Sequence, residues 1–79
     1  MAIRSFILQD QFEIDDNGIT HKPTGWKFTP YPGDPTHGTV IEGRAGQKLE
    51  TGEDYGRYEV REMAQSLWLK YLRDRKKIP

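Results

Sequence analysis

The chain has 79 residues, with 12 lysines and arginines against 12 aspartates and glutamates, no cysteine and 34% hydrophobic residues. This length predicts a single small domain, 1–79. Without cysteine the chain cannot form a disulfide framework, a thiolate metal site or a thiol nucleophile. Its stability must come from packing, to which nine aromatic residues can contribute large buried areas.

The longest uninterrupted apolar run is Phe6-Ile7-Leu8. A membrane-spanning helix needs about 20 apolar residues, so no membrane partner is expected. The first residues also lack the apolar core of a signal peptide. These features predict a soluble, cytoplasmic protein.

The first zone of the chain is predicted to form strands. The apolar stretch at its start favours a strand near 3–8, and the alternation of Phe12-Glu13-Ile14-Asp15 predicts a second over 12–15. Asn17-Gly18 is a strong hairpin signal, because both central residues of a tight type I′ turn need positive φ. A returning strand over 19–22 follows.

The hairpin also sets which side chains share a face. If Asn17-Gly18 is the two-residue loop, Asp16 pairs with Ile19 and Ile14 pairs with His21. One face of this pair then carries Phe12, Ile14, Ile19 and His21.

The middle zone contains most of the glycines and prolines. A strand over 26–29 is predicted, with Trp26 and Phe28 turned inward, and Pro30 and Pro32 are expected to end it. Residues 31–38 are interpreted as a rigid, irregular surface loop, followed by a short strand over 39–42. The stretch 47–54 is predicted to be loop and helix entry.

The last zone predicts one amphipathic helix over about 55–75. Its apolar residues recur at spacings of three and four and form one stripe. Thr51 or Asp54 is the expected N-cap, and the basic residues gather in a tail, 73–79, that complements the helix dipole. The stripe consists of Val60, Met63, Ala64, Leu67, Trp68, Tyr71 and Leu72.

A small sheet and an amphipathic helix each need a cover for one apolar face. The predicted fold is therefore α+β: a small antiparallel β-meander of three to four short strands, covered on one face by the single C-terminal helix. The core is expected where Phe12, Ile14, Trp26 and Phe28 meet Met63, Leu67 and Tyr71.

No constellation in the sequence points to catalysis, to a cofactor or to a metal. The only histidines are His21 and His37, interpreted as a partly buried sheet residue and a polar turn residue. Ser66, His37 and Asp34 have the residue types of a catalytic triad, but nothing in the sequence indicates that the three lie close together. Two scattered histidines do not define a zinc site. The chain is therefore expected not to be an enzyme.

An apolar and aromatic strip is left over after the core is assigned. Helical rotation puts Tyr55, Tyr58 and Leu69 opposite the buried stripe, with Glu62 and Gln65 between them, and Tyr31 lies in the proline-rich loop. Strips of this kind are typical of interfaces. Alternatively, Tyr55 and Tyr58 fold back over 47–54 and Leu69 is simply exposed. The favoured hypothesis is a non-catalytic protein–protein interaction domain, acting by self-association or inside a larger assembly.

The alternative function is nucleic-acid binding, because residues 70–79 carry five basic residues and one acidic residue. The aromatic strand containing Trp26 and Phe28 would then stack bases. The acidic remainder of the chain would repel a polyanion. The phosphate contacts would be Lys22, Lys27, Lys70, Arg73, Arg75, Lys76 and Lys77.

Overall fold

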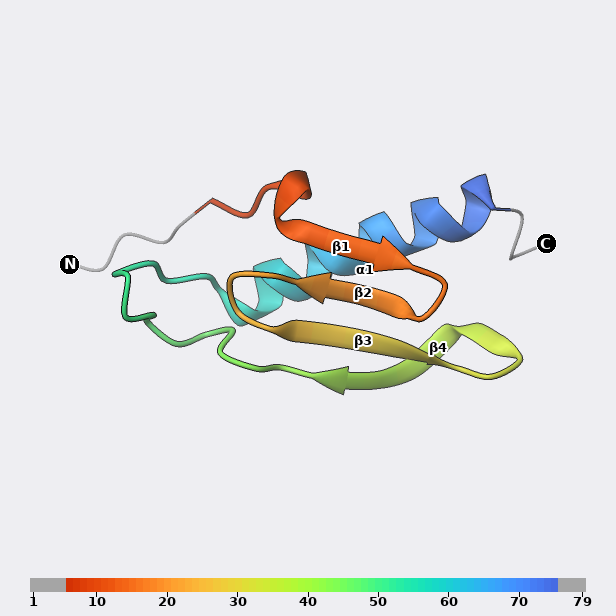
Figure 1. Cartoon of the computed structure of the whole chain (residues 1–79), viewed down its shortest axis with the longest axis horizontal. Coiled ribbons are helices and arrows are strands. Elements are labelled where there is room, and N and C mark those ends of the chain that lie inside the picture. Colours follow the sequence, from red (N-terminus) through yellow and green to blue (C-terminus); the bar gives the residue numbers. More distant parts are fainter. Residues whose placement is uncertain (1–5, 76–79) are drawn as a thin grey trace.

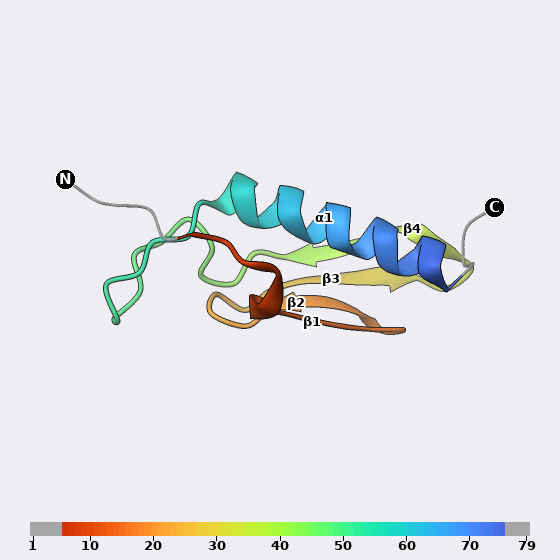
Figure 2. The same cartoon turned by 90° about the horizontal axis from the view of Figure 1, so that it is seen from above.

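The computed structural model describes residues 6–75, which form an antiparallel sheet of four strands and one long helix (Figure 1). The sheet is a meander in the order β1-β2-β3-β4, and α1 lies along one of its faces only (Figure 2). This confirms the predicted α+β architecture. The elements are a 3₁₀ turn at Gln9–Gln11, β1 Phe12–Asp15, β2 Gly18–His21, β3 Trp26–Tyr31, β4 Asp34–Ile41 and α1 Arg57–Asp74.

Alternation along the strands sorts the side chains between the two faces of the sheet. Two cross-strand rows face α1: one runs from Phe12 through His21 to Trp26, and the other joins Ile14, Ile19, Phe28 and Val40. The opposite face carries Glu13, Thr20, Lys27 and Ile41 in one row, so that face is mostly polar, with an exposed isoleucine on β4.

The first hairpin has a different register from the one predicted. Asp15 pairs with Gly18 and Ile14 with Ile19, so the turn residues are Asp16 and Asn17 rather than Asn17 and Gly18. The Asn17 N–H donates to the Asp15 carboxylate at 2.8 Å, which closes the turn one residue early. The register moves by two residues, so the prediction that Phe12, Ile14, Ile19 and His21 share a face is still confirmed.

The second hairpin contradicts the predicted loop over 31–38. β3 continues through Pro30 to Tyr31, and β4 begins at Asp34, so the connection is only Pro32-Gly33. Proline followed by a glycine at φ 81° suits a tight type II turn. The ladder shifts between Pro30 and Tyr31. Residues 35–37 of β4 bulge out there, and the prolines bend the hairpin without ending it.

The ends of the other predicted strands also differ. Residues 6–8 of the expected strand near 3–8 are not in a strand, and residues 1–5 lie outside the described residues. The strand expected over 19–22 is β2, which ends at His21 and leaves Lys22 in a turn. The strand expected over 39–42 is the end of β4.

The helix prediction is largely confirmed. α1 begins at Arg57, and five residues of the predicted stripe are buried, while Met63 and Tyr71 are partly buried. The N-cap is Gly56, without a side-chain cap, so Thr51 and Asp54 do not have the expected role. Of the basic tail 73–79, residues 76–79 lie outside the described part of the chain.

The core is larger than the predicted one, because the segment between β4 and α1 contributes to it. Ala45, Leu49 and Tyr55 are buried together with the sheet and helix residues. Trp68 connects the two layers: its ring stacks on Tyr71 at a centroid distance of 5.4 Å, and it also contacts Phe28. The predicted contact between the aromatic residues of the strands and the residues of α1 is thus present. The segment between β4 and α1 forms a third side of the core.

His21 is fully buried and is part of a hydrogen-bonded network. Its Nδ1 lies 2.8 Å from the Thr24 hydroxyl, and its Nε2 lies 2.9 Å from Oε1 of Gln11. Thr24 Oγ1 accepts from the Trp26 N–H and can donate to Nδ1, so the network suits a neutral ring with its proton on Nε2. Burial lowers the pKa of His21 below its ordinary 6.5.

This buried imidazole predicts a pH-dependent stability. The unfolded chain binds a proton at His21 near pH 6.5 and the folded chain only at lower pH. The stability is therefore fully present above 6.5 and decreases as the pH falls toward the folded pKa, by up to about 1.4 kcal/mol per pH unit. Urea unfolding between pH 7 and 5 measures the slope, and the His37→Gln variant should keep it. An NMR titration showing that folded His21 protonates near 6.5 would contradict this explanation.

Candidate functional site

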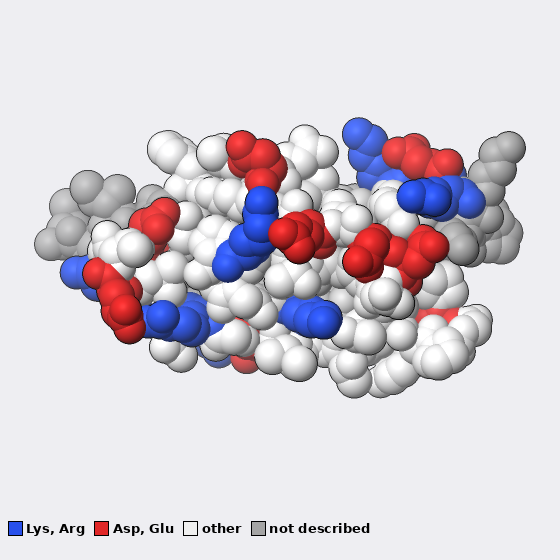
Figure 3. Space-filling model, viewed as in Figure 1, with Lys and Arg blue, Asp and Glu red and all other residues white. Residues whose placement is uncertain are grey.

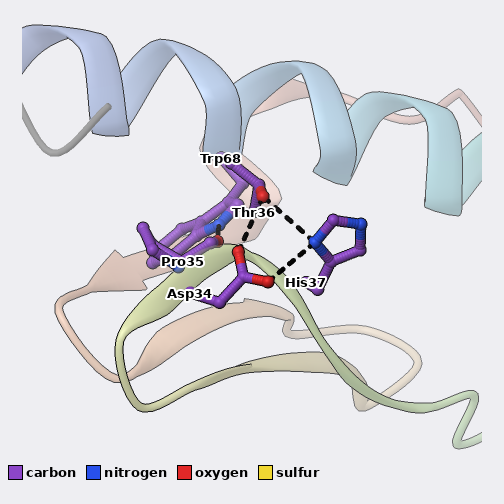
Figure 4. Close-up of polar contacts among 5 residues, drawn as sticks. All are labelled: Asp34, Pro35, Thr36, His37 and Trp68. Atoms are coloured by element: carbon purple, nitrogen blue, oxygen red, sulfur yellow. Dashed lines mark hydrogen bonds and ion pairs between the residues drawn. The ribbon is translucent and has the colours of Figure 1, made fainter. Parts of the chain in front are cut away.

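A histidine, a carboxylate and a hydroxyl contact one another directly in the cluster of Asp34, Thr36 and His37 on β4 (Figure 4). His37 Nδ1 lies 3.0 Å from Asp34 Oδ2 and 3.2 Å from the Thr36 hydroxyl, which itself donates to Asp34 Oδ1. The hydrogen bonds from Thr36 and then His37 lower the pKa of Asp34.

This arrangement is not that of a catalytic triad. In a triad the nucleophile and the carboxylate contact opposite nitrogens of the imidazole, so that a proton can be relayed. Here Thr36 and Asp34 both contact Nδ1. Ser66 lines a different hollow with Met63. The structure therefore does not bring Ser66 together with His37 and Asp34. The cluster stabilises the bulge of β4, and His37 lies in this exposed strand segment rather than in a turn.

The metal candidates are likewise separated. His21 is buried against Tyr55, with ring centroids 4.9 Å apart, while His37 is exposed on β4. In the part of the chain that the structure describes, no group of three or more histidines, aspartates or glutamates is placed to hold an ion.

Within residues 6–75, the side chains proposed for nucleic-acid binding are divided between the open face of the sheet and α1. Lys22 and Lys27 lie near the open face of the sheet, which carries charges of both signs (Figure 3). Trp26 is only 3% exposed and Phe28 packs against the core, so their rings are not available to stack bases. Lys70, Arg73 and Arg75 lie at the C-terminal end of α1, and Lys76 and Lys77 are outside the described residues.

The predicted interaction strip is divided by the structure. Tyr55 precedes α1 and is buried, and its hydroxyl donates to Glu53, which raises the pKa of Tyr55 to about 12. The prediction that Tyr55 faces outward is therefore wrong, and its burial in one core with Leu49 agrees with the alternative in which Tyr55 folds back over 47–54, whereas Tyr58 is exposed. Glu62 faces a separate hollow beside Met63 and Ser66.

Three residues of the strip stay together on the side of α1 that faces β4: Tyr58, Gln65 and Leu69. Tyr58 is exposed, whereas Leu69 is partly buried against the core. The prediction that Leu69 points directly away from the sheet is wrong, because Leu69 packs partly against the core and lines a hollow between α1 and β4.

This gap is a groove made of two adjoining hollows, of about 300 and 390 Å³, that share Trp26, Val40 and Arg61. Helix residues spaced by three and four form one wall, and β4 forms the other. The floor is apolar. The helix wall includes Tyr58, Arg61, Gln65 and Leu69, the other wall consists of Thr36, His37, Gly38 and Val40 of β4 with Glu42 directly after it, and the floor consists of Ile19, Trp26, Phe28 and Trp68.

The outer wall of the groove is also the last strand of the sheet. Alternate residues of an antiparallel edge strand turn their N–H and C=O groups away from the sheet. Gly38 stands opposite Pro30, which has no N–H to donate, so we assign these two residues to a pair without hydrogen bonds between the strands. The N–H and C=O groups of Gly38, and of Val40 two residues later, then point away from the sheet. Val40 and Ile41 are 48% and 62% exposed. β4 therefore presents an apolar strand edge next to an apolar groove.

The charges around the groove are only partly paired. The Arg57 guanidinium lies 3.8 Å from the Glu42 carboxylate and also above the Tyr58 ring. Within residues 6–75, no carboxylate lies within ion-pair distance of Arg61. The groove thus contains one unpaired cation at its middle and a loosely held carboxylate at one end.

Tyr31 lies outside this groove. It is 52% exposed and lines a separate hollow of about 510 Å³ between the tips of the two hairpins and the end of α1. There the Tyr71 hydroxyl donates to Asp16 at 2.6 Å, which raises the pKa of Tyr71, and Arg75 covers the Tyr71 ring. The two surfaces proposed from the sequence are therefore distinct.

The β4 side of the groove was missed because 31–38 were assigned to an irregular loop, and the predicted strand over 39–42 was not recognised as a candidate binding edge. The signal that could have revealed it is the pair Val40-Ile41 next to Thr39, an apolar β-branched run without the lysine or proline that protects an edge. No helix among the described residues is long and apolar enough to span a bilayer. Comparison of the chain with protein-family models, with curated proteins and with solved structures finds no match in any of the three.

Proposed function

We propose that this chain is a non-catalytic protein-binding domain that receives an extended segment of another chain along β4. The observation that supports this most directly is the coincidence of a free strand edge with the apolar groove between β4 and α1. Strand addition supplies main-chain hydrogen bonds, and adjacent pockets accept alternate side chains of the added segment.

The dimensions of β4 suit this mode of binding. It has eight residues, twice the length of β1, and its last residues are β-branched. A segment that pairs with Gly38 and Val40 would place alternate side chains over Trp26 and Phe28 and against Leu69. Burial of these apolar groups contributes about 25 cal/mol per Å² of area removed from water, before the cost of ordering the segment.

The proposal predicts that the chain selects extended peptides from a displayed library of random twelve-residue peptides. The synthesised peptides should bind the unaltered chain, and Val40→Lys should weaken binding at least tenfold, because a lysine on the edge opposes strand pairing. Leu69→Asp should have a similar effect. Fluorescence anisotropy of labelled peptides measures the affinity.

The control is Tyr31→Ala, which removes an exposed ring from the other hollow and should leave the affinity unchanged. Circular dichroism confirms that each variant is folded. If the selected peptides bind the Val40 and Leu69 variants as tightly as the unaltered chain, or if Tyr31→Ala alone abolishes binding, the proposed site is wrong.

A further inference from the structure

We infer that the segment received along β4 is β4 of a second copy of this chain, so that two copies form one continuous eight-stranded sheet around a two-fold axis. This inference rests on the proposed function and identifies the partner. Antiparallel pairing of a strand with itself is compatible with two-fold symmetry, because each copy presents the same surface to the other.

The backbone pattern of β4 supports this pairing. The N–H and C=O groups of Gly38 and Val40 point away from β3, and the two residues lie on the same face of the sheet. The ladder between the two copies can therefore be centred on Val40. Each copy then covers the exposed Val40 and Ile41 of the other. The strand edge, with its unpaired backbone groups, is thereby removed from solvent.

Charge complementarity across the axis favours the same arrangement. When Val40 pairs with Val40 of the second copy, Gly38 stands opposite Glu42 of that copy. Gly38 and Arg61 line the same hollow of the groove. The incoming Glu42 carboxylate therefore enters the hollow in which Arg61 has no partner, and symmetry forms this contact twice.

The other sheet edge is less suited to self-pairing. β1 has only four residues, and two of them are Glu13 and Asp15, followed directly by Asp16. Two such edges brought together would place like charges side by side, which is destabilising. The charge distribution thus selects β4 as the edge that meets a second copy.

The test is sedimentation velocity over a concentration series. The unaltered chain should show a dimer that dissociates on dilution. Arg61→Glu places two carboxylates at each contact and Glu42→Arg places two cations there, so each variant alone should raise the dimer dissociation constant at least tenfold. An equimolar mixture of the two variants should restore the dimer, because each contact then again joins one cation and one carboxylate.

The mixture distinguishes a contact between copies from one within a copy, since a contact within one chain is not restored by mixing. Arg73→Glu, a charge reversal near the end of α1, is the matched control and should leave dimerisation unchanged. Hydrogen exchange gives a second measurement: the amide protons of Gly38 and Val40 should exchange more slowly as the concentration rises.

A chain that stays monomeric at every concentration overturns the inference, as does a mixture that does not associate. A dimer in which exchange at Gly38 and Val40 does not change with concentration also overturns it. These results would reject the dimer but not the proposed function, because binding of selected peptides along β4 is measured separately. Loss of peptide binding together with an intact dimer at another surface would instead reject the proposed function.

Discussion

Gly18→Ala is expected to destabilise the folded chain by about 3 kcal/mol or more, the sum of backbone strain and a steric clash. Gly18 begins β2 at φ 136°, where residues with a side chain are rare. An added Cβ would lie 2.0 Å from the carbonyl oxygen of Phe28 in the neighbouring strand. Because this neighbour is backbone within the sheet, it cannot move without disturbing the β2–β3 ladder.

The matched control is Gly25→Ala. Gly25 also has a positive φ, of 76°, but an added Cβ there meets nothing within 4 Å. This variant should therefore lose only about 1 kcal/mol, from backbone conformation alone. Chemical unfolding monitored by tryptophan fluorescence gives both values. Equal losses in the two variants would show that the close approach at Phe28 is not the cause.

Trp68→Ala is expected to cost about 3–5 kcal/mol, the range for removal of a large buried aromatic ring. The ring packs on Tyr71 and Phe28, and its Nε1–H donates to the Pro35 carbonyl oxygen at 2.8 Å. Small domains have total stabilities of only about 5–15 kcal/mol. This single change should therefore leave a substantial unfolded population at 37 °C, which thermal unfolding by circular dichroism would measure.

Trp68→Phe separates the two roles of this side chain. Phenylalanine keeps most of the ring contacts but cannot donate to Pro35, so about 1 kcal/mol should be lost. Because that hydrogen bond ties the bulge of β4 to α1, the amide NMR shifts of 34–38 should change more in this variant than those of β1. Shift changes confined to α1 would contradict this role of the indole N–H.

The layers of the fold could be predicted because their signals are local. The spacing of the helix stripe and the alternation in β1 and β3 depend on neighbouring residues, and each matches the structure closely. The first hairpin was predicted with the wrong turn residues because Asn-Gly is only a preference. The Asp15 carboxylate accepts a hydrogen bond from the N–H of Asn17, two residues later, and the turn lies one residue earlier than predicted.

The start of β4 could not be predicted from such signals. Pro30, Pro32 and Pro35 suggest a loop, but Pro30 needs no N–H opposite Gly38, and the bulge at 35–37 accommodates the third proline. Besides the local cluster of Asp34, Thr36 and His37, the bulge is held by the hydrogen bond between Trp68 and Pro35, which lie 33 positions apart. A contact between residues so far apart in the sequence cannot be predicted from local sequence patterns.

Only the helix side of the candidate site was predicted from the sequence. Helical rotation correctly brings Tyr58, Gln65 and Leu69 to one side, but it treats residue 55 as helical, whereas α1 begins at Arg57. It also assumes that the sheet covers the helix symmetrically. In the structure, the helix side that rotation assigned to solvent lines a groove between α1 and β4.

The unequal edges of the sheet also set how large an assembly can grow. Once two β4 strands have joined, the outermost strands of the combined sheet are both β1, short and negatively charged. Neither offers a third molecule the long apolar template that drives fibre elongation. If the proposed dimer forms, association should therefore stop at two subunits, and the negatively charged β1 edges should oppose further aggregation in concentrated solution.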